Sequence, residues 1–413
     1  MKSFSLLFIF SIFLSGGLFG QNFVYPEFEL LSVDYGGELL TIKKDNGTGS
    51  YTGIEWLAGE ENQLPVAYVS GSAPVTAASF NMFCDQAPDS ILVRGICPEG
   101  MTFEPVVVPV TNVEPGAYTF NYPSHEANTV FESAVVRYFD TFNIGWDVSF
   151  DSGETWRTVD TSRNTLYVTK NAPMARTGLF DWYHSVYDIS CRNADMNSSE
   201  TDVIAGIWSE FTDQIVLNHN SDSLHYYKPK GTYNTNLAAL LKYKNAQCYT
   251  FAQLFLACIK IQGIERSNNY VYITPRTSYV CGNSVNRFLV KNWSFGAPTG
   301  TGCADFPYEN TYTTLIPPPY TDYSFITEDV SDEAGLPGQC SPNPSSYFNN
   351  HQISKIDGVY YDACYGVTFD SLEDIPFEGF SGWGYRYTSG GVTHARFTND
   401  MEITELRENI TTY

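Results

Sequence analysis

One cysteine stands where its thiol could act as a nucleophile. Cys248 opens the apolar segment CYTFAQLFLACIKIQG, whose spacing predicts a long, mostly buried helix from Cys248 to Gly263. Backbone N–H groups at a helix N-terminus favour a thiolate, and they can stabilise an oxyanion formed beside it. The alternative is a half-buried structural cysteine, bridged for example to Cys191. The position of Cys248 in the sequence favours neither the nucleophile nor the structural cysteine.

A thiol nucleophile needs a base, and one of the six histidines has a partner by strand geometry. The segment from Asn350 to Gly366 contains two strand-like runs around Asp357-Gly358, a strong signal for a two-residue hairpin loop. Counting outward from that loop places His351 opposite Cys364, with Asp362 one diagonal step away. The backbones of His351 and Asp362 are then roughly 7–8 Å apart, which lets their side chains meet. A carboxylate that orients an imidazole belongs to a catalytic triad, whereas an ordinary cross-strand pair is the structural alternative.

The segments around these residues predict an α+β unit over residues 170–413. Apolar stripes indicate helices over Ser198–Ile215, with Ser199 or Thr201 as N-cap, and over Asn234–Lys244. Strands are predicted over Asn269–Pro275 and Phe288–Trp293. Helices followed by a sheet are the order of an α+β domain.

Residues 21–169 predict a separate, all-β unit. Short β-branched and aromatic runs alternate with turn residues, a pattern that favours an antiparallel, immunoglobulin-like sandwich. Within it, SFDSGETW (Ser149–Trp156) resembles a single Asp-box. We interpret this motif as a tight structural turn held by Asp151 and Gly153, and a sugar site is the alternative interpretation.

The N-terminal residues predict export. Lys2 precedes the apolar run Leu6–Leu14, and small residues up to Gly20 complete the pattern of a signal peptide over residues 1–20. No later segment approaches 18 unbroken apolar residues, so we expect no membrane insertion. The sequence therefore predicts a secreted or cell-surface protein.

Export to an oxidising compartment also predicts disulfides among the nine cysteines. Cys84 and Cys97 enclose a short segment and are the expected local pair. A Pro-, Gly- and Asn-rich stretch from Gly296 to Ser346 predicts a long loop, with Cys303 and Cys340 as a candidate staple.

Charge and motif content exclude several classes of partner. The 413 residues carry 23 Lys and Arg against 46 Asp and Glu, a formal charge of -23 that repels phosphate backbones, so no nucleic-acid partner is expected. No CxxC pair and no Asp-rich loop with regular ligand spacing occurs, so we expect no metal or cofactor, with calcium on the acidic surface as the one ion considered.

The segments that contain Cys248, His351 and Asp362 are together similar to those of a known superfamily. NAQCYTFAQLFLACIKIQGI resembles the active-site segment of the transglutaminase-like superfamily, which has a papain-like fold, through matches at Gln247, Cys248, Phe251, Ala252, Gly263 and Ile264. The later segment matches the superfamily's His and Asp region at His351, Gly358, Tyr361 and Asp362. The order Cys, His, Asp is also that of the superfamily, and the N-terminal sandwich suggests a secreted bacterial type.

The resemblance implies an enzyme that transfers acyl groups from protein or peptide amides. Cys248 would be the nucleophile, His351 the proton carrier and Asp362 its orienting group, while Gln247 and Tyr249 would contact the oxyanion or the substrate. A thioester would then be resolved by water or by an amine, and the sequence does not decide which. An upstream aromatic donor to the oxyanion has three candidates: Trp208, Tyr226 and Tyr227.

Two other classes of function stay open at this point. A surface or binding protein could keep the fold after losing activity, an interpretation favoured by Ile353, which stands where the superfamily often has Trp. A carbohydrate-binding protein centred on the Asp-box is the third interpretation. Substrate identity and oligomeric state are not determined by the sequence.

Overall fold

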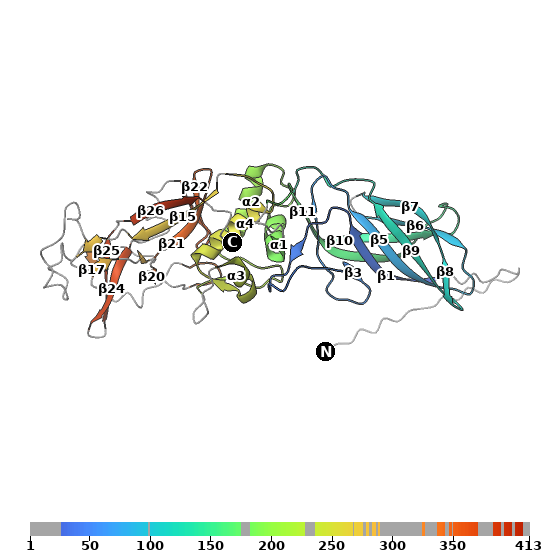
Figure 1. Ribbon diagram of the computed structural model, residues 1–413, viewed down its shortest axis with the longest axis horizontal. Helices are drawn as coiled ribbons and strands as arrows, with labels where there is room; N and C mark the ends of the chain where they lie inside the picture. Colours follow the sequence, from blue (N-terminus) through green and yellow to red (C-terminus); the bar gives the residue numbers. More distant parts are fainter. Residues whose placement is uncertain are drawn as a thin grey trace, which may run out of the picture.

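The computed structural model describes residues 26–97, 100–174, 182–227, 236–266, 268–275, 337–342 and 350–370, with further strands within 278–289, 324–326, 347–348 and 383–407. The signal peptide predicted over residues 1–20 lies outside these residues, as do Cys281, Cys303 and most of the predicted loop. The described chain is strand-rich and contains four α-helices, which lie between a large β-structure and a smaller sheet (Figure 1). None of these helices is long and apolar enough to cross a membrane.

The first half of the chain forms two five-stranded sheets around one apolar core (Figure 1). One sheet has the order β3 (Trp56–Leu57), β1 (Glu27–Gly36), β5 (Val75–Phe83), β9 (Ala117–Glu126), β8 (Thr111–Glu114). The other has the order β4 (Val66–Val69), β11 (Arg157–Thr169), β10 (Arg137–Ser149), β6 (Ser90–Ile96), β7 (Thr102–Pro109). The pairings are antiparallel except that of β4 with β11.

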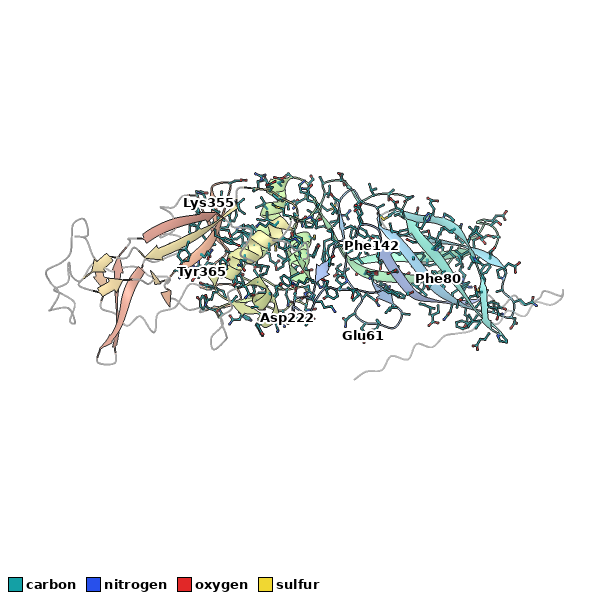
Figure 2. All side chains as sticks on the ribbon, in the orientation of Figure 1. Glu61, Phe80, Phe142, Asp222, Lys355 and Tyr365 are labelled. Atoms are coloured by element: carbon teal, nitrogen blue, oxygen red, sulfur yellow. The ribbon has the colours of Figure 1, made fainter. Side chains whose placement is uncertain are left out.

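Alternation of apolar and polar residues builds this core. Every second residue of β5 is buried, as expected for a strand with one face inward. Phe80 stacks on Phe120 with ring centroids 4.8 Å apart, and Trp146 packs edge-on against Phe80. The side chains of Phe80 and Phe142 lie among the strands of this β-structure (Figure 2).

The expected disulfide between Cys84 and Cys97 is absent, and this prediction was wrong. Cys84 follows β5 in one sheet, whereas Cys97 follows the far end of β6 in the other, so the full length of β6 separates the two cysteines. Cys340 of the second predicted pair also has no disulfide, and none joins the seven cysteines in the described part of the chain. A disulfide requires the two cysteines to be close in space, and closeness in the sequence does not ensure this.

The Asp-box segment forms the turn between β10 and β11, as its structural interpretation predicts. Asp151 accepts hydrogen bonds from the Thr155 amide at 2.8 Å and the Thr155 hydroxyl at 2.5 Å, and Ser149 Oγ donates to it at 2.7 Å. Gly153 has a φ of 93°, in the left-handed region that glycine adopts without strain. These hydrogen bonds lower the pKa of Asp151 to about 2. The carboxylate is therefore engaged by its own turn.

The four helices of the second half are α1 (His184–Asn193), α2 (Glu200–Thr212), α3 (Leu237–Tyr243) and α4 (Cys248–Lys260). The three predicted helices are confirmed with shorter bounds. Ser199 caps α2 by accepting from the Asp202 amide. Helix α1 was not predicted, because eight of its ten residues are buried although six of the ten are polar, so no apolar stripe marks the helix in the sequence.

A five-stranded sheet packs beside α4. Its order is β23 (Val367–Phe369), β22 (Val359–Asp362), β21 (His351–Ile356), β15 (Asn268–Pro275), β26 (Met401–Arg407). The predicted strand at Asn269–Pro275 is thus confirmed as β15. Strand β21 faces α4, where Ser354 Oγ donates to the Ala252 carbonyl at 3.4 Å.

Further strands lie toward the end of the chain. They are the hairpin β16 (Ser278–Val280) and β17 (Asn283–Val285), and a sheet of order β19 (Ser324–Ile326), β25 (Val392–Thr398), β24 (Trp383–Ser389), β18 (Phe288–Leu289), β20 (Tyr347–Phe348). The strand predicted over Phe288–Trp293 begins as β18, and its last residues lie outside the described ranges.

The two halves are joined by backbone pairing and by a buried polar cluster. Strand β2 (Ile42–Lys43) pairs in parallel with β12 (Trp182–Tyr183). Next to it, Asp45 accepts a hydrogen bond from the Ser185 amide at 3.2 Å and lies 2.9 Å from His219 Nδ1. Because Ser185 is in the first turn of α1, Asp45 acts as an N-terminal cap supplied by the other half of the chain.

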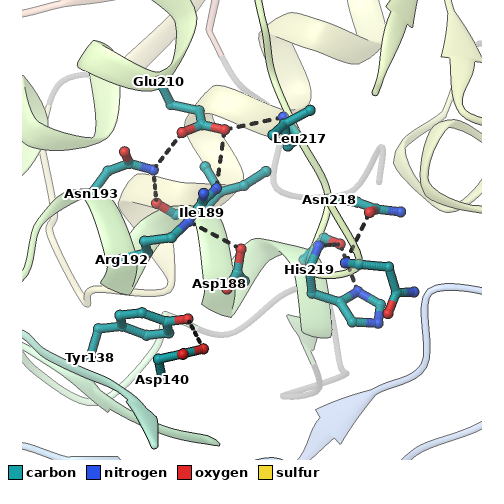
Figure 3. Close-up of polar contacts among 12 residues, drawn as sticks. Tyr138, Asp140, Asp188, Ile189, Arg192, Asn193, Glu210, Leu217, Asn218 and His219 are labelled. Carbon is teal, nitrogen blue, oxygen red and sulfur yellow. Dashed lines mark hydrogen bonds and ion pairs between the residues drawn. The ribbon is translucent and has the colours of Figure 1, made fainter. Parts of the chain in front are cut away.

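Glu210 of α2 organises the chain that leads toward α4 (Figure 3). Its carboxylate accepts from Arg192 at 3.1 Å, from Asn193 at 2.9 Å and from the Leu217 amide at 3.1 Å. These contacts fix α1 against α2 and hold the segment before β13 (His225–Tyr226). Strand β13 in turn pairs in parallel with β14 (Asn245–Ala246), directly before Cys248.

Candidate active site

Cys248 is the first residue of α4, as the sequence predicts. Gln247 is its N-cap, with extended backbone dihedrals and no capping hydrogen bond from its side chain. The Cys248 side chain is in the core of the second half, with a residue exposure of 5%, and it forms no disulfide. The alternative bridge to Cys191 is therefore absent; Cys191 is fully buried and its thiol donates to the Val168 carbonyl at 3.8 Å.

The hairpin predicted around Asp357-Gly358 is confirmed. Ile356 pairs with Val359, and both loop residues have positive φ angles of 49° and 93°, as a type I′ turn requires. The pairing ends before it reaches Cys364, because the chain turns after Asp362, and His351 instead pairs on its other side with Ile273 of β15. The predicted position of His351 opposite Cys364 in the ladder was wrong in this respect.

The side chains of His351 and Asp362 nevertheless meet. His351 Nε2 lies 2.8 Å from Asp362 Oδ2, and neither residue has exposed surface. The second oxygen of Asp362 accepts from the Cys364 amide at 3.0 Å. The carboxylate is thus held by backbone and imidazole together, which fixes the orientation of the ring.

The Cys248 side chain also lies close enough to the imidazole to affect its pKa. Burial by itself lowers the pKa of His351, but the charge and hydrogen bond of Asp362 and the interaction with Cys248 outweigh it and raise the pKa to about 10. A pKa of about 10 favours a protonated imidazole at neutral pH, hydrogen-bonded to the Asp362 carboxylate and near the Cys248 sulfur. Such a pair is the arrangement in which a cysteine is activated as a nucleophile.

Cys364 and Tyr365 form a wall of this site; the sequence placed Cys364 near His351 but gave neither residue a role. The Cys364 thiol donates to the Cys248 carbonyl at 3.8 Å, and burial, with Asp362 and Cys248 nearby, holds its pKa well above the ordinary value. The Tyr365 ring lies 5.7 Å from the His351 ring and 5.4 Å from the Tyr226 ring. For Tyr365 the only local signal was its nearness to Asp362 in YDACYG.

The three aromatic candidates for an oxyanion donor have different surroundings in the structure. Trp208 packs against Phe211, Phe255 and Tyr361 in the helical core. Tyr226 is fully buried, and burial holds the pKa of its hydroxyl well above the ordinary value, with Tyr365, Cys364 and Cys248 nearby. Tyr227 lies beside it, and its amide donates to the Ala246 carbonyl at 3.1 Å.

Gln247 and Tyr249 flank Cys248 and are both half-buried. The Gln247 carbonyl accepts from the Thr250 amide at 3.1 Å, which shapes the first turn of α4. The Tyr249 ring lies 5.4 Å from the ring of Tyr270 on β15. Both residues are therefore at the site, on either side of the sulfur in the chain.

His351, Asp362 and Cys364 also place three metal-capable side chains within 4.8 Å of one another. Nitrogen, carboxylate and thiolate donors of this kind suit zinc. However, His351 and Asp362 are hydrogen-bonded directly to each other, and a metal ion between them would displace that bond. The donor set fits a hydrogen-bonded triad better than a metal centre.

No family model and no curated protein sequence matches the chain. A solved structure of red sea bream transglutaminase is similar at a TM-score of 0.24 and 12% identity, over 81% of this chain and 51% of that chain. The chain thus spans about half the length of that protein. A likeness of this size carries no argument about function.

Proposed function

We propose that the protein is a secreted, cysteine-dependent acyl-transfer enzyme of transglutaminase-like type, acting on protein or peptide amides. The observation that supports it is the position of His351, which is hydrogen-bonded to Asp362 and lies close enough to the Cys248 side chain for that side chain to raise its pKa. In this proposal residues 170–413 form a papain-like domain, and residues 21–169 form an immunoglobulin-like sandwich that spaces or targets it.

The proposed reaction has two stages. The Cys248 sulfur attacks the amide carbonyl, and the carbon–nitrogen bond breaks as His351 delivers a proton to the leaving amine. The Cys248 amide at the N-terminus of α4 stabilises the oxyanion, with Gln247 and Tyr249 as the flanking contacts. Water or a second amine then attacks the thioester, giving its proton to His351 and releasing Cys248.

A binding protein without activity is the second candidate. The enclosure of the site favours it, because Cys248 is 5% exposed and His351 and Asp362 have no exposed surface. A substrate carbonyl reaches the sulfur only if the side chains over Cys248 move. The choice between these candidates depends on whether the sulfur is chemically reactive.

Iodoacetamide labelling at pH 6, followed by peptide mass spectrometry, separates the two. In an enzyme, the Cys248 thiolate is alkylated on the order of 10²-fold faster than an ordinary thiol at that pH, and His351→Ala removes the advantage. His225→Ala is the matched control, since His225 binds the Cys340 carbonyl outside the site. Equal rates at Cys248 in the unmodified protein and in His351→Ala would contradict the proposal.

Product analysis then assigns the second stage. Fluorescein-labelled casein reports hydrolysis, and incorporation of dansylcadaverine into casein reports transfer to an amine. Both are measured with and without EDTA, and the proposal, which invokes no metal, expects no change on EDTA treatment. A reactive Cys248 with neither product would favour the binding protein.

A further inference from the structure

The outer face of the sheet β4-β11-β10-β6-β7 carries a polar hollow unrelated to the candidate active site. Its volume is about 420 Å³, and its lining includes Ile96, Asn143, Gly145, Asp147, Thr161 and Arg163. All of these residues belong to the central strands β6, β10 and β11, or follow directly from them. The hollow is therefore built on rigid strands and not on loops.

Gly145 creates the hollow. It stands in the middle strand, paired with Ile96 of β6 on one side and Thr161 of β11 on the other. A Cβ atom at this position would meet only the Ile96 carbonyl, at 3.7 Å, so the missing side chain leaves open space between two side-chain-bearing strands. The floor is thus flat backbone, with polar side chains around it.

One end of the hollow is already neutralised. Arg94 donates to Asp147 Oδ2 through Nε at 3.1 Å and Nη2 at 2.9 Å, and Thr158 donates to Asp147 Oδ1 at 2.6 Å. The Arg94 guanidinium also covers the ring of Trp156, 4.0 Å from its centroid. At this end the hydrogen bonds of the Asp147 carboxylate are made within the protein, and its charge is balanced by that of Arg94.

At the other end of the hollow, one side-chain polar atom has no hydrogen-bond partner in the described part of the chain. Asn143 Oδ1 is buried and has no hydrogen-bond partner within the described chain, although it lines the hollow. Arg163 is directly across from Asn143 in the β10–β11 register and is exposed. The Asn143, Arg163 and Thr161 side chains therefore line the same space, and an amide, a guanidinium and a hydroxyl together include hydrogen-bond donors and acceptors.

We propose that this hollow binds a neutral saccharide. Ring hydroxyls both donate and accept, so they match a set of Asn143, Thr161 and Arg163 better than a purely anionic or purely apolar ligand does. The formal charge of -23 repels acidic polymers from a shallow surface site, which favours a neutral sugar over a uronic acid. This site would make the sandwich a glycan-targeting module, independent of the chemistry at Cys248.

The test uses the full mature chain on an array of neutral oligosaccharides, and native affinity electrophoresis in gels containing laminarin, xylan, galactomannan or soluble starch, with alginate as the acidic comparison. We expect retardation by a neutral polysaccharide. Asn143→Ala and Arg163→Ala should each raise its dissociation constant about tenfold, the effect of losing one well-placed hydrogen bond. Asn112→Ala, exposed on β8 of the opposite sheet, is the matched control.

Three results would overturn the proposal. The first is no retention by any neutral glycan on the array or in the gels. The second is equal affinity of Arg163→Ala and Asn112→Ala; because Arg163 is exposed, its variant keeps the core intact. The third is retention by alginate alone. None of these results depends on Cys248, so this proposal and the proposed enzyme activity can fail separately.

Discussion

The Nε2 atom of His351 lies 2.8 Å from Oδ2 of Asp362, with both side chains fully enclosed. The two residues come from opposite strands of one hairpin, and Cys248 reaches the same imidazole from the N-terminus of α4. A buried carboxylate that already holds a backbone amide and an imidazole cannot be replaced without changing the charge state of the ring. This relationship determines the first two predictions.

Asp362→Asn should slow alkylation of Cys248. The amide keeps the size of the carboxylate but removes the charge that raises the pKa of His351, so less of the imidazolium beside the Cys248 sulfur remains near neutral pH. We expect the iodoacetamide rate at pH 6 to fall by at least about tenfold. Asp357→Asn, in the exposed hairpin loop, is the control, and identical rate–pH profiles for both variants would refute the role of Asp362.

The stability gained from His351 should decline at high pH. Its pKa in the folded protein is about 10, above the ordinary value of 6.5, so folding favours the protonated form. That contribution is complete below about pH 6.5 and is lost as the pH rises toward the folded-state pKa. Urea unfolding of the unmodified protein and His351→Gln between pH 6 and pH 10 should show a shrinking difference; a difference that grows with pH would contradict this sign.

Gly366→Ala should destabilise the protein more than Gly358→Ala. Both glycines have positive φ angles, 69° and 93°, which cost an alanine about 1–2 kcal/mol. A Cβ on Gly366 would also collide with the Phe211 carbonyl, whereas a Cβ on Gly358 meets nothing. Overpacking adds about 1–3 kcal/mol for Gly366. Equal unfolding free energies for the two variants would show that the turn after Asp362 relaxes freely.

Glu210→Gln should loosen the segment before β13. The carboxylate holds Arg192, Asn193 and the Leu217 amide, and the weaker amide leaves part of this buried set unsatisfied (Figure 3). We expect a loss of about 1–3 kcal/mol in unfolding free energy. Glu200→Gln, at the exposed start of α2, is the control and should cost less. Hydrogen exchange of the Leu217 amide checks the mechanism, since it should accelerate in Glu210→Gln only.

Local signals in the sequence determined the parts of the site that depend on near neighbours. The Asp357-Gly358 pair specifies a hairpin because both positions need positive φ, and this alone brings His351 and Asp362 onto neighbouring strands. The start of α4 at Cys248 follows from the apolar spacing of its helix. Alternation in strands such as β5 likewise predicted an all-β first half.

Only the tertiary structure decided how distant segments meet. Cys84 and Cys97 are close in sequence but follow strands of opposite sheets, and helix α1 is buried although six of its ten residues are polar. The cap that Asp45 provides to α1, and the wall that Cys364 and Tyr365 build beside Cys248, leave no periodic pattern. Such contacts arise from packing between elements far apart in the chain, where burial and shape complementarity, and not local backbone preference, select the neighbour.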